Sequence, residues 1–115
     1  RDTDRSRGLG DVYKRQELAC FEIISNVGMA KTCYINAIHK AEEGEYEEAK
    51  KLIEEGNEHY AEGHKAHVEM IQKEASGESV ETCLLLIHAE DQMMSAETFQ
   101  VLAGEFIKMC KMINK

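Results

Sequence analysis

The sequence predicts an all-α protein built as an antiparallel up-down-up three-helix bundle. The chain of 115 residues contains no proline or tryptophan, a composition that favours long helices because proline is the strongest helix breaker. Apolar residues recur three or four positions apart in three long segments. The breaks between these segments contain glycine and span only about two to four residues, so neighbouring helices must be antiparallel.

The first helix is expected over residues 17–43, because Gly44 is a natural residue to follow a helix C-terminus. The second is expected over residues 46–75 and ends where Ser76-Gly77-Glu78 breaks the pattern. The positions expected to face the core are Leu18, Phe21, Ile24, Gly28, Cys33, Ala37, Ile38 and Ala41 in the first helix, and Ala49, Leu52, Ile53, Gly56, Tyr60, Gly63, His67, Met70 and Ile71 in the second.

The third helix is expected from about Ser79, a plausible N-cap residue, to Asn114. Its apolar seam is predicted to consist of Leu84, Ile87, Asp91, Met94, Thr98, Leu102, Phe106 and Met109. Residues 84–87 are apolar around nearly a full helical turn, and a single hairpin cannot easily bury both sides of such a turn. The pattern therefore favours self-association through the third helix.

The first sixteen residues differ from the rest of the chain. Residues 1–16 lack apolar periodicity and carry five basic and three acidic residues, so we expect a disordered tail or a segment foreign to the natural protein. Residues 17–115 are expected to form the folded three-helix domain. From residue 17 onward the chain has 9 basic and 19 acidic residues, so the acidic character belongs to this domain.

Charge and composition exclude several classes of protein. The net charge of −8 argues against nucleic acid or an anionic membrane as partner and favours a basic one. No apolar run approaches the roughly 18 residues of a membrane span, and no secretory signal pattern is evident. Cys20, Cys33, Cys83 and Cys110 lie in apolar segments without a CxxC motif, so we expect buried, reduced thiols in a cytoplasmic protein without membrane insertion.

His88 and Asp91 are the strongest candidates for chemistry, because they lie one turn apart on nearly the same face of the third helix. A titratable pair among apolar residues lowers stability unless other groups satisfy it, and such pairs often mark functional sites. A neutral imidazole has a nucleophilic ring nitrogen that can carry a phosphoryl group. Copies of Asp91 gathered by symmetry would repel one another unless they share protons or a hard cation such as Mg²⁺.

Other interpretations of these residues stay open. Asp91 is alternatively a polar residue that sets the register of a coiled coil, and His88 a satisfied core or boundary histidine. On that basis the protein is a non-catalytic helical interaction module, or a metal-binding bundle without phosphoryl transfer. His64 and His67 are three positions apart but lack a further ligand at convincing spacing, so they are a weak metal candidate.

Two further histidines and two methionines are not expected to take part in chemistry. His39 and His59 are expected to be ordinary surface residues. Met93 and Met94 are expected to be core residues, with a soft docking surface beside His88 as the minority alternative.

Several segments resemble, in the same order along the chain, the lactose/cellobiose-type enzyme IIA of the bacterial phosphoenolpyruvate-dependent sugar phosphotransferase system. Residues 88–97 (HAEDQMMSAE) are similar to its active segment, and residues 21–31 (FEIISNVGMAK) to its first helix. Residues 52–57 (LIEEGN) and 63–75 (with GHKAH and QKEA at its ends) are similar to its second helix. The resemblance extends from about residue 17 to the C-terminus, and several motifs in order make it more specific than one short pattern.

The resemblance implies a homotrimer with nine helices in which His88 is phosphorylated at Nε2. His88 would accept phosphate from the carrier HPr and pass it to a cysteine of the cognate IIB component, for uptake of a lactose-, cellobiose- or chitobiose-type sugar. It also implies one Mg²⁺ per trimer, shared by Asp91 of three subunits. The wording Glu90-Asp91-Gln92 favours the cellobiose/chitobiose branch, and Gln92 is a weaker candidate for assisting the phosphoryl group.

Overall fold

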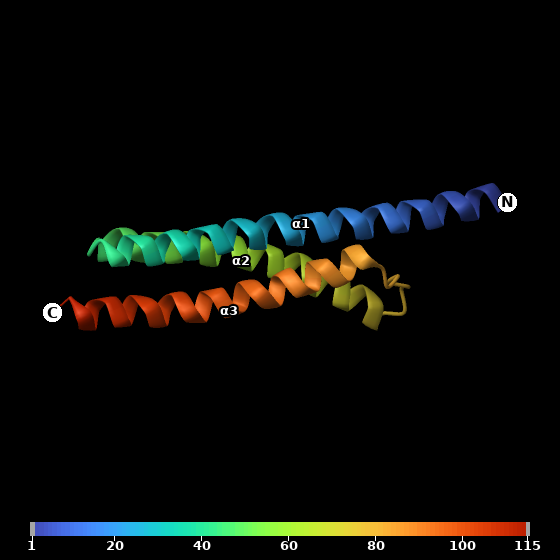
Figure 1. Ribbon diagram of the computed structural model, residues 1–115. Coiled ribbons are helices and arrows are strands. Elements are labelled where there is room, and N and C mark those ends of the chain that lie inside the picture. The colour runs from blue at the N-terminus through green and yellow to red at the C-terminus, as the bar shows by residue number, and fades with distance from the viewer. Residues whose placement is uncertain (1, 115) are drawn as a thin grey trace.

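The computed structural model describes residues 2–114, with side chains described for residue 8 and for residues 10–114. Its three helices are α1 (Asp2–Glu42), α2 (Tyr46–Ala75) and α3 (Leu84–Ile113). They run up, down and up (Figure 1), which confirms the predicted all-α three-helix bundle within one chain. The bundle measures 71 × 21 × 18 Å. None of these helices combines the length and the apolar character that crossing a bilayer requires.

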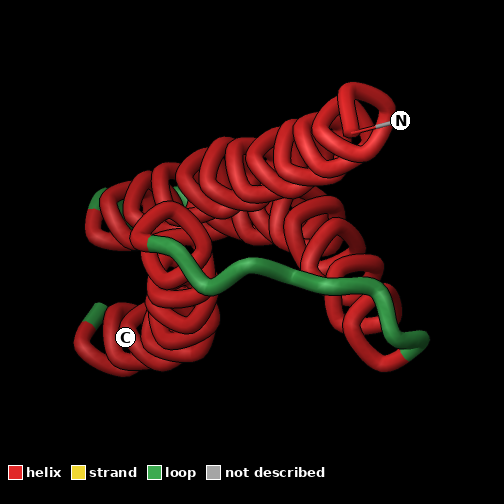
Figure 2. The backbone as a smooth tube through the Cα atoms, turned by 90° about the vertical axis from the view of Figure 1, so that its right-hand side faces the viewer, coloured by secondary structure: helices red, strands yellow, loops and turns green. Residues whose placement is uncertain are grey.

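The three helices do not pack equally. α1 packs extensively against α2 and against α3, whereas α2 and α3 contact each other least. The view along the bundle shows α2 and α3 on two sides below α1, joined by the long connection that crosses one end (Figure 2). Much of the surface of α3 is therefore left uncovered by the rest of its own chain.

α1 and α2 approach each other closely because glycine replaces a side chain at two positions of α2. A Cβ atom at Gly56 would lie 2.6 Å from Cε1 of Tyr34, and one at Gly63 would lie 3.0 Å from Cγ1 of Val27. The Tyr34 hydroxyl donates a hydrogen bond to Oδ1 of Asn57 at 2.7 Å. Gln100 of α3 donates to the same oxygen at 2.7 Å, so this cluster ties all three helices together.

The core lies where α1 faces the other two helices. Its largest fully buried side chains are Tyr34, Ile23, Val27 and Cys20, all from α1. Among the positions of α1 and α2 predicted to face the core, three are instead exposed: Leu18 at 66%, Phe21 at 57% and Ile71 at 52%. The prediction for α1 was wrong at its start because this part of the helix carries two apolar stripes. The stripe shifted by two residues is the one that faces α2 and α3.

Residues 2–16, expected to be a disordered tail or a foreign segment, form the N-terminal part of α1 in the structure. The segment contains no proline, and once a helix has nucleated further residues can add to it, although Gly8 and Gly10 each cost about 1 kcal/mol relative to alanine. Contacts with the α2–α3 connection also hold it, since the Gln16 side chain accepts a hydrogen bond from the Glu81 N–H at 2.9 Å and donates one to the Glu81 carbonyl. That this segment is foreign to the natural protein stays a prediction. The outer ends of the two predicted domains, residues 1 and 115, lie outside the described residues.

The connection between α2 and α3 is longer than expected. α3 begins at Leu84 and not near Ser79, so residues 76–83 form the connection. Gly77 adopts a φ of +94°, which ends α2 because this left-handed region favours glycine. The side chain of Gln16 then bonds both backbone groups of Glu81, and Cys83 is extended at φ −144° and ψ 167°. The hydrogen bonds from Gln16 thus occupy the backbone groups of Glu81 that would form helical hydrogen bonds if α3 began at Ser79.

All four cysteines are free, and two of them differ from the predicted burial. Cys20 and Cys33 are buried in α1, as expected. Cys83 is exposed because it stands in the extended connection before α3, and Cys110 is only partly buried near the open C-terminal end of the bundle.

Candidate functional site

α3 presents different residues to its own bundle and to the outside. Its buried residues are Ala89, Met93, Ala96 and Ala103. The predicted seam of residues 84, 87, 91, 94, 98, 102, 106 and 109 is exposed throughout, so it does not face the core of its own chain. The prediction that Met94 is a core residue is wrong, because its side chain is 67% exposed, whereas Met93 is buried at 5%.

His88 and Asp91 both lie on this exposed side of α3, one turn apart. His88 is the fifth residue of the helix, directly before the buried Ala89. Asp91 lies between Ile87, exposed at 54%, and Met94. Within the described residues neither side chain forms a hydrogen bond or an ion pair with another side chain. A nucleophilic ring and a carboxylate are thus both available to molecules outside the chain.

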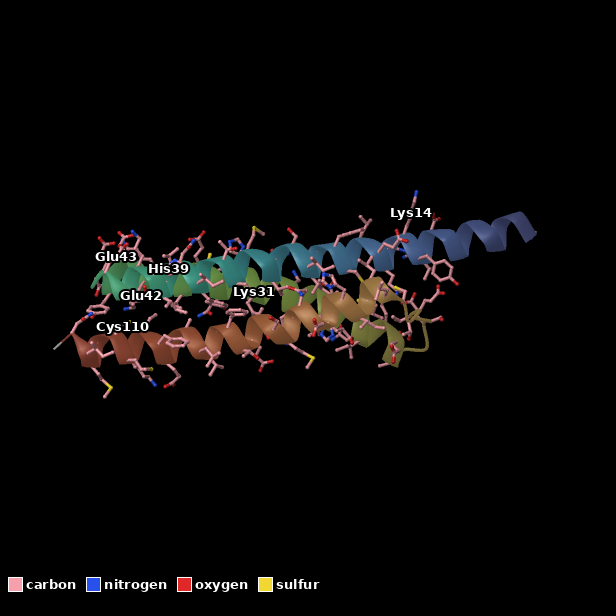
Figure 3. The ribbon with its side chains drawn as sticks, viewed as in Figure 1. Lys14, Lys31, His39, Glu42, Glu43 and Cys110 are labelled. Atoms are coloured by element: carbon pink, nitrogen blue, oxygen red, sulfur yellow. The ribbon has the colours of Figure 1, made fainter. Side chains whose placement is uncertain are left out.

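Gln92, one turn after His88, joins α3 to α1. Its Oε1 accepts a hydrogen bond from Nζ of Lys31 at 3.0 Å. Lys31 lies on the side of α1 that faces α3 (Figure 3), and its Nζ is also 5.2 Å from the centroid of the Phe99 ring. Because the amide oxygen is engaged by the ammonium group, the two N–H groups of Gln92 are the ones left to donate to a further acceptor.

A groove between α2 and α3 lies close to this region. It is lined by Tyr60, His64, His67, Glu90, Met93, Met94 and Glu97. Nε2 of His67 is 3.3 Å from a carboxylate oxygen of Glu90, which links α2 to the turn that holds His88. His64 instead stacks on the Tyr60 ring at a centroid distance of 6.2 Å. The two histidines therefore turn to different neighbours, and among the described residues they do not belong to a group of three potential metal ligands.

Asp91 is suited to a cation site only if the site is shared. It offers one carboxylate per chain, and oxygen donors of this kind suit Mg²⁺. Its exposure among apolar side chains leaves both oxygens open to a ligand from outside the chain. The residues present therefore fit a Mg²⁺ site composed of several copies of Asp91, and not a site within one chain.

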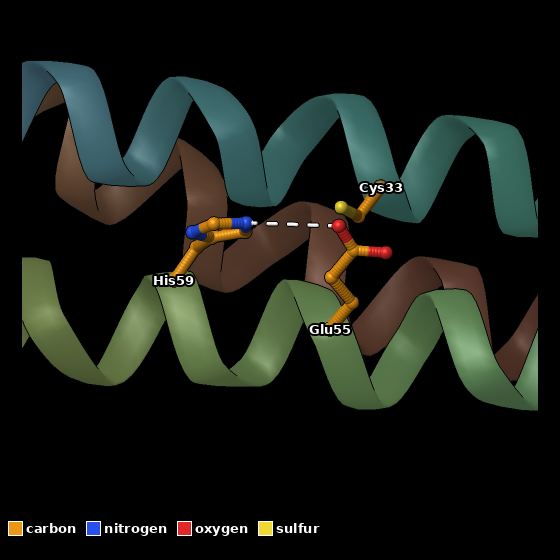
Figure 4. A group of neighbouring side chains, drawn as sticks. All are labelled: Cys33, Glu55 and His59. Carbon is orange, nitrogen blue, oxygen red and sulfur yellow. Dashed lines mark ion pairs between the residues drawn. The ribbon is translucent and has the colours of Figure 1, made fainter.

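A second group of potential ligands was missed by sequence reasoning. Cys33 of α1 lies close to Glu55 and His59 of α2 (Figure 4), and their ligand atoms are all within 4.8 Å of one another. Burial, followed by the charge of Glu55, raises the pKa of the Cys33 thiol. The spacing of Glu55 and His59, four residues apart on one helix, was the available signal, but the contribution of Cys33 depends on how α1 packs on α2.

Comparisons with known proteins give matches over most of the chain. Residues 18–111 match the family model described as the lactose/cellobiose-specific IIA subunit of the phosphotransferase system. The chain is 34% identical over 102 residues to the lichenan-specific phosphotransferase enzyme IIA component of Bacillus subtilis, covering 89% of this chain and 93% of that protein. It is 36% identical over 98 residues to the oligo-beta-mannoside-specific EIIA component of the same organism, covering 85% and 89%. The crystal structure of the cellobiose-specific enzyme IIA from Bacillus anthracis superposes with a TM-score of 0.84 at 37% identity, covering 86% of this chain and 91% of that one.

Proposed function

This chain belongs to the lactose/cellobiose-specific IIA family of the sugar phosphotransferase system, and from that premise we propose that it is a phosphocarrier with His88 as the phosphorylated residue. It accepts the phosphoryl group from phospho-HPr and passes it to a cysteine of the cognate IIB component, for uptake of a lactose-, cellobiose- or chitobiose-type sugar. The observation that carries the proposal is the exposure of His88 on the uncovered side of α3, with no side-chain partner among the described residues.

Two displacements at phosphorus account for the activity. In the first, the unprotonated ring nitrogen of His88, expected to be Nε2, attacks the phosphorus of phospho-HPr. The new N–P bond forms as the N–P bond to HPr breaks. In the second, the thiolate of the IIB cysteine attacks, so that an S–P bond forms and the ring of His88 leaves. Such transfers pass through a loose transition state, so the carrier mainly positions the partners and balances charge.

Gln92 and Lys31 are placed to assist the charged intermediate. Phosphorylation adds roughly −1.5 to −2 charge, which an acidic protein must accommodate. Gln92 lies four residues after His88, on the same face of α3. Lys31 donates a hydrogen bond of 3.0 Å to the amide oxygen of Gln92, which leaves the N–H groups of Gln92 free to donate to a phosphoryl oxygen. The same bond brings the positive charge of Lys31 to this part of α3.

A homotrimer with nine helices would cover the uncovered side of α3. Among the described residues, nine of the large apolar side chains that are exposed belong to α3: Leu84, Ile87, Met94, Val101, Leu102, Phe106, Met109, Met112 and Ile113. The chain exposes 7950 Å², whereas a compact monomer of 13.0 kDa exposes roughly 6300 Å². Asp91 lies within this apolar surface, so association would bring three carboxylates together. One Mg²⁺ shared among them would offset their repulsion.

The test is phosphorylation in a reconstituted system. The purified chain is mixed with phosphoenolpyruvate, enzyme I and HPr, and its intact mass is measured. We expect a gain of one phosphate per chain in the wild type and in His39→Ala, a control at an exposed histidine of α1. We expect no gain in His88→Ala, with unchanged far-ultraviolet circular dichroism. Phosphate on the His88→Ala chain would show that the assignment is wrong.

The same experiment separates the alternatives. If the protein is a helical interaction module or a metal-binding bundle without phosphoryl transfer, the wild-type chain will gain no phosphate. The family membership favours the phosphocarrier, and the absence of any gain with an active HPr preparation would favour one of the other two.

A further inference from the structure

Three side chains of types that can bind a metal lie away from the proposed phosphorylation site, in the groove between α1 and α2. Figure 4 shows Cys33 on α1 facing Glu55 and His59 on α2, with α3 behind them. The thiol sulfur, a carboxylate oxygen and an imidazole nitrogen all lie within 4.8 Å of one another. Nε2 of His59 is 3.9 Å from Oε1 of Glu55. None of these residues belongs to α3, which carries His88 and Asp91.

The packing of the helices brings these groups together. Glu55 and His59 are four residues apart, so they project from one face of α2 on successive turns. Gly56, beside Glu55, lets α1 approach: a Cβ atom there would lie 3.1 Å from Cβ of Cys33. Cys33 is buried at 8% exposure, so its position is set by packing. The side chains of Glu55 and His59 are 57% and 29% exposed, so they can adjust to a ligand.

We propose that Cys33, Glu55 and His59 form a binding site for a divalent cation of the zinc class. A thiolate, an imidazole and a carboxylate are the donor types that zinc takes in proteins, and three protein ligands with a water molecule complete a tetrahedral site. Magnesium is excluded as the occupant because it prefers oxygen donors alone. Ligand atoms at roughly 2.0–2.3 Å from zinc must lie closer to one another than the 3.9 Å between His59 and Glu55. Binding therefore requires rotation of these two partly exposed side chains toward the Cys33 sulfur.

A nucleophilic role for Cys33 is the competing chemical interpretation, and the surroundings of the thiol argue against it. Reactive cysteines have a lowered pKa, whereas burial and the charge of Glu55 raise the pKa of the Cys33 thiol. A metal ion reverses this balance because it binds the thiolate and releases the proton. Zinc binding should therefore strengthen as the pH rises from 6 to 8.

The experiment is titration of the chain with Zn²⁺ alone, competed with a chromophoric chelator, alongside titration with Co²⁺ followed by absorption. We expect one ion per chain and a thiolate-to-cobalt charge-transfer band. Cys33→Ser should abolish the band, and His59→Ala and Glu55→Gln should each weaken zinc binding at least tenfold. Cys83→Ala and His39→Ala are matched controls at an exposed cysteine and an exposed histidine, and they should bind as the wild type does.

Several outcomes would overturn the proposal. These are no binding of zinc, binding that survives Cys33→Ser or His59→Ala, or binding that is lost in Cys83→Ala. If Cys33→Ser fails to fold, His59→Ala still decides the question, because its side chain is partly exposed on α2. Phosphorylation of His88 is measured separately in the His59→Ala chain, so failure of the zinc site and failure of the phosphocarrier proposal are distinguishable.

Discussion

Replacing Gly56 by alanine tests the close contact between α1 and α2 on which the core depends. In a helix interior alanine is about 1 kcal/mol more favourable than glycine. At Gly28 of α1 nothing lies within 4 Å of an added Cβ atom, so Gly28→Ala should stabilise the fold by about 0.5–1 kcal/mol. This substitution is the matched control, because it changes the helix propensity in the same way without the contact.

At Gly56 the same gain is opposed by overlap. The added Cβ atom would lie 2.6 Å from Cε1 and 3.0 Å from Cδ1 of Tyr34. The ring cannot move aside easily, because it is fully buried and its hydroxyl is bonded to Asn57. Overpacking of this kind costs about 1–3 kcal/mol. After subtraction of the propensity gain of about 1 kcal/mol, Gly56→Ala should destabilise the fold by up to about 2 kcal/mol.

The assay is urea unfolding followed by far-ultraviolet circular dichroism. Wild type and both variants are compared at one protein concentration, since self-association makes apparent stability depend on concentration. We expect the midpoints to rank Gly28→Ala, wild type, Gly56→Ala from highest to lowest. If Gly56→Ala is as stable as Gly28→Ala, the two helices can separate at no cost and the argument from close approach is wrong.

Three further predictions follow from the structure. Burial raises the pKa of the Tyr34 hydroxyl from 10.0 to about 12. The neutral hydroxyl therefore contributes roughly 2–3 kcal/mol to the free energy of unfolding below pH 10, and this contribution is lost as the pH rises to 12. In urea unfolding, the stability of the wild type should fall more steeply over this pH range than that of Tyr34→Phe. Asp91→Leu should keep or increase the stability of the proposed trimer while removing the proposed Mg²⁺ site, because it replaces clustered charge by apolar packing. A monomeric variant in light scattering would contradict this. Gln16→Ala removes both side-chain bonds to Glu81 and should speed amide exchange in residues 79–83, and unchanged protection would show that these bonds do not hold the connection.

The sequence alone predicted the number and order of the helices well, because long periodic segments and their breaks are local features. Periodicity did not identify which of two apolar stripes faces the core. Leu18 and Phe21 were assigned to the core and are exposed, whereas Cys20 and Ile23, two positions further along, are fully buried. The two stripes have the same spacing and similar apolar character, so only the packing of α1 against its neighbours distinguishes them.

The start of α3 was missed for a different reason. Ser79 has the residue type of an N-cap, but the Glu81 backbone is bonded by a side chain sixty-five positions away. This long-range contact outweighs the local preference and delays the helix to Leu84. The same contact anchors Gln16, the last residue of the N-terminal segment, to the connection between α2 and α3.

Residues of a site can be predicted from spacing only when they share a helix. His88 and Asp91 are three positions apart on α3, so their relative placement follows from helix geometry whatever the rest of the chain does. Cys33 lies close to His59 only because α1 is rotated so that the sulfur faces α2, and because Gly56 allows the two helices to approach closely. If the Gly56→Ala substitution shifts α1 as its predicted overlap requires, it should also weaken zinc binding, whereas Gly28→Ala should leave it unchanged. Helix packing and the proposed metal site thus depend on one contact, and the zinc titration of these two variants measures that dependence directly.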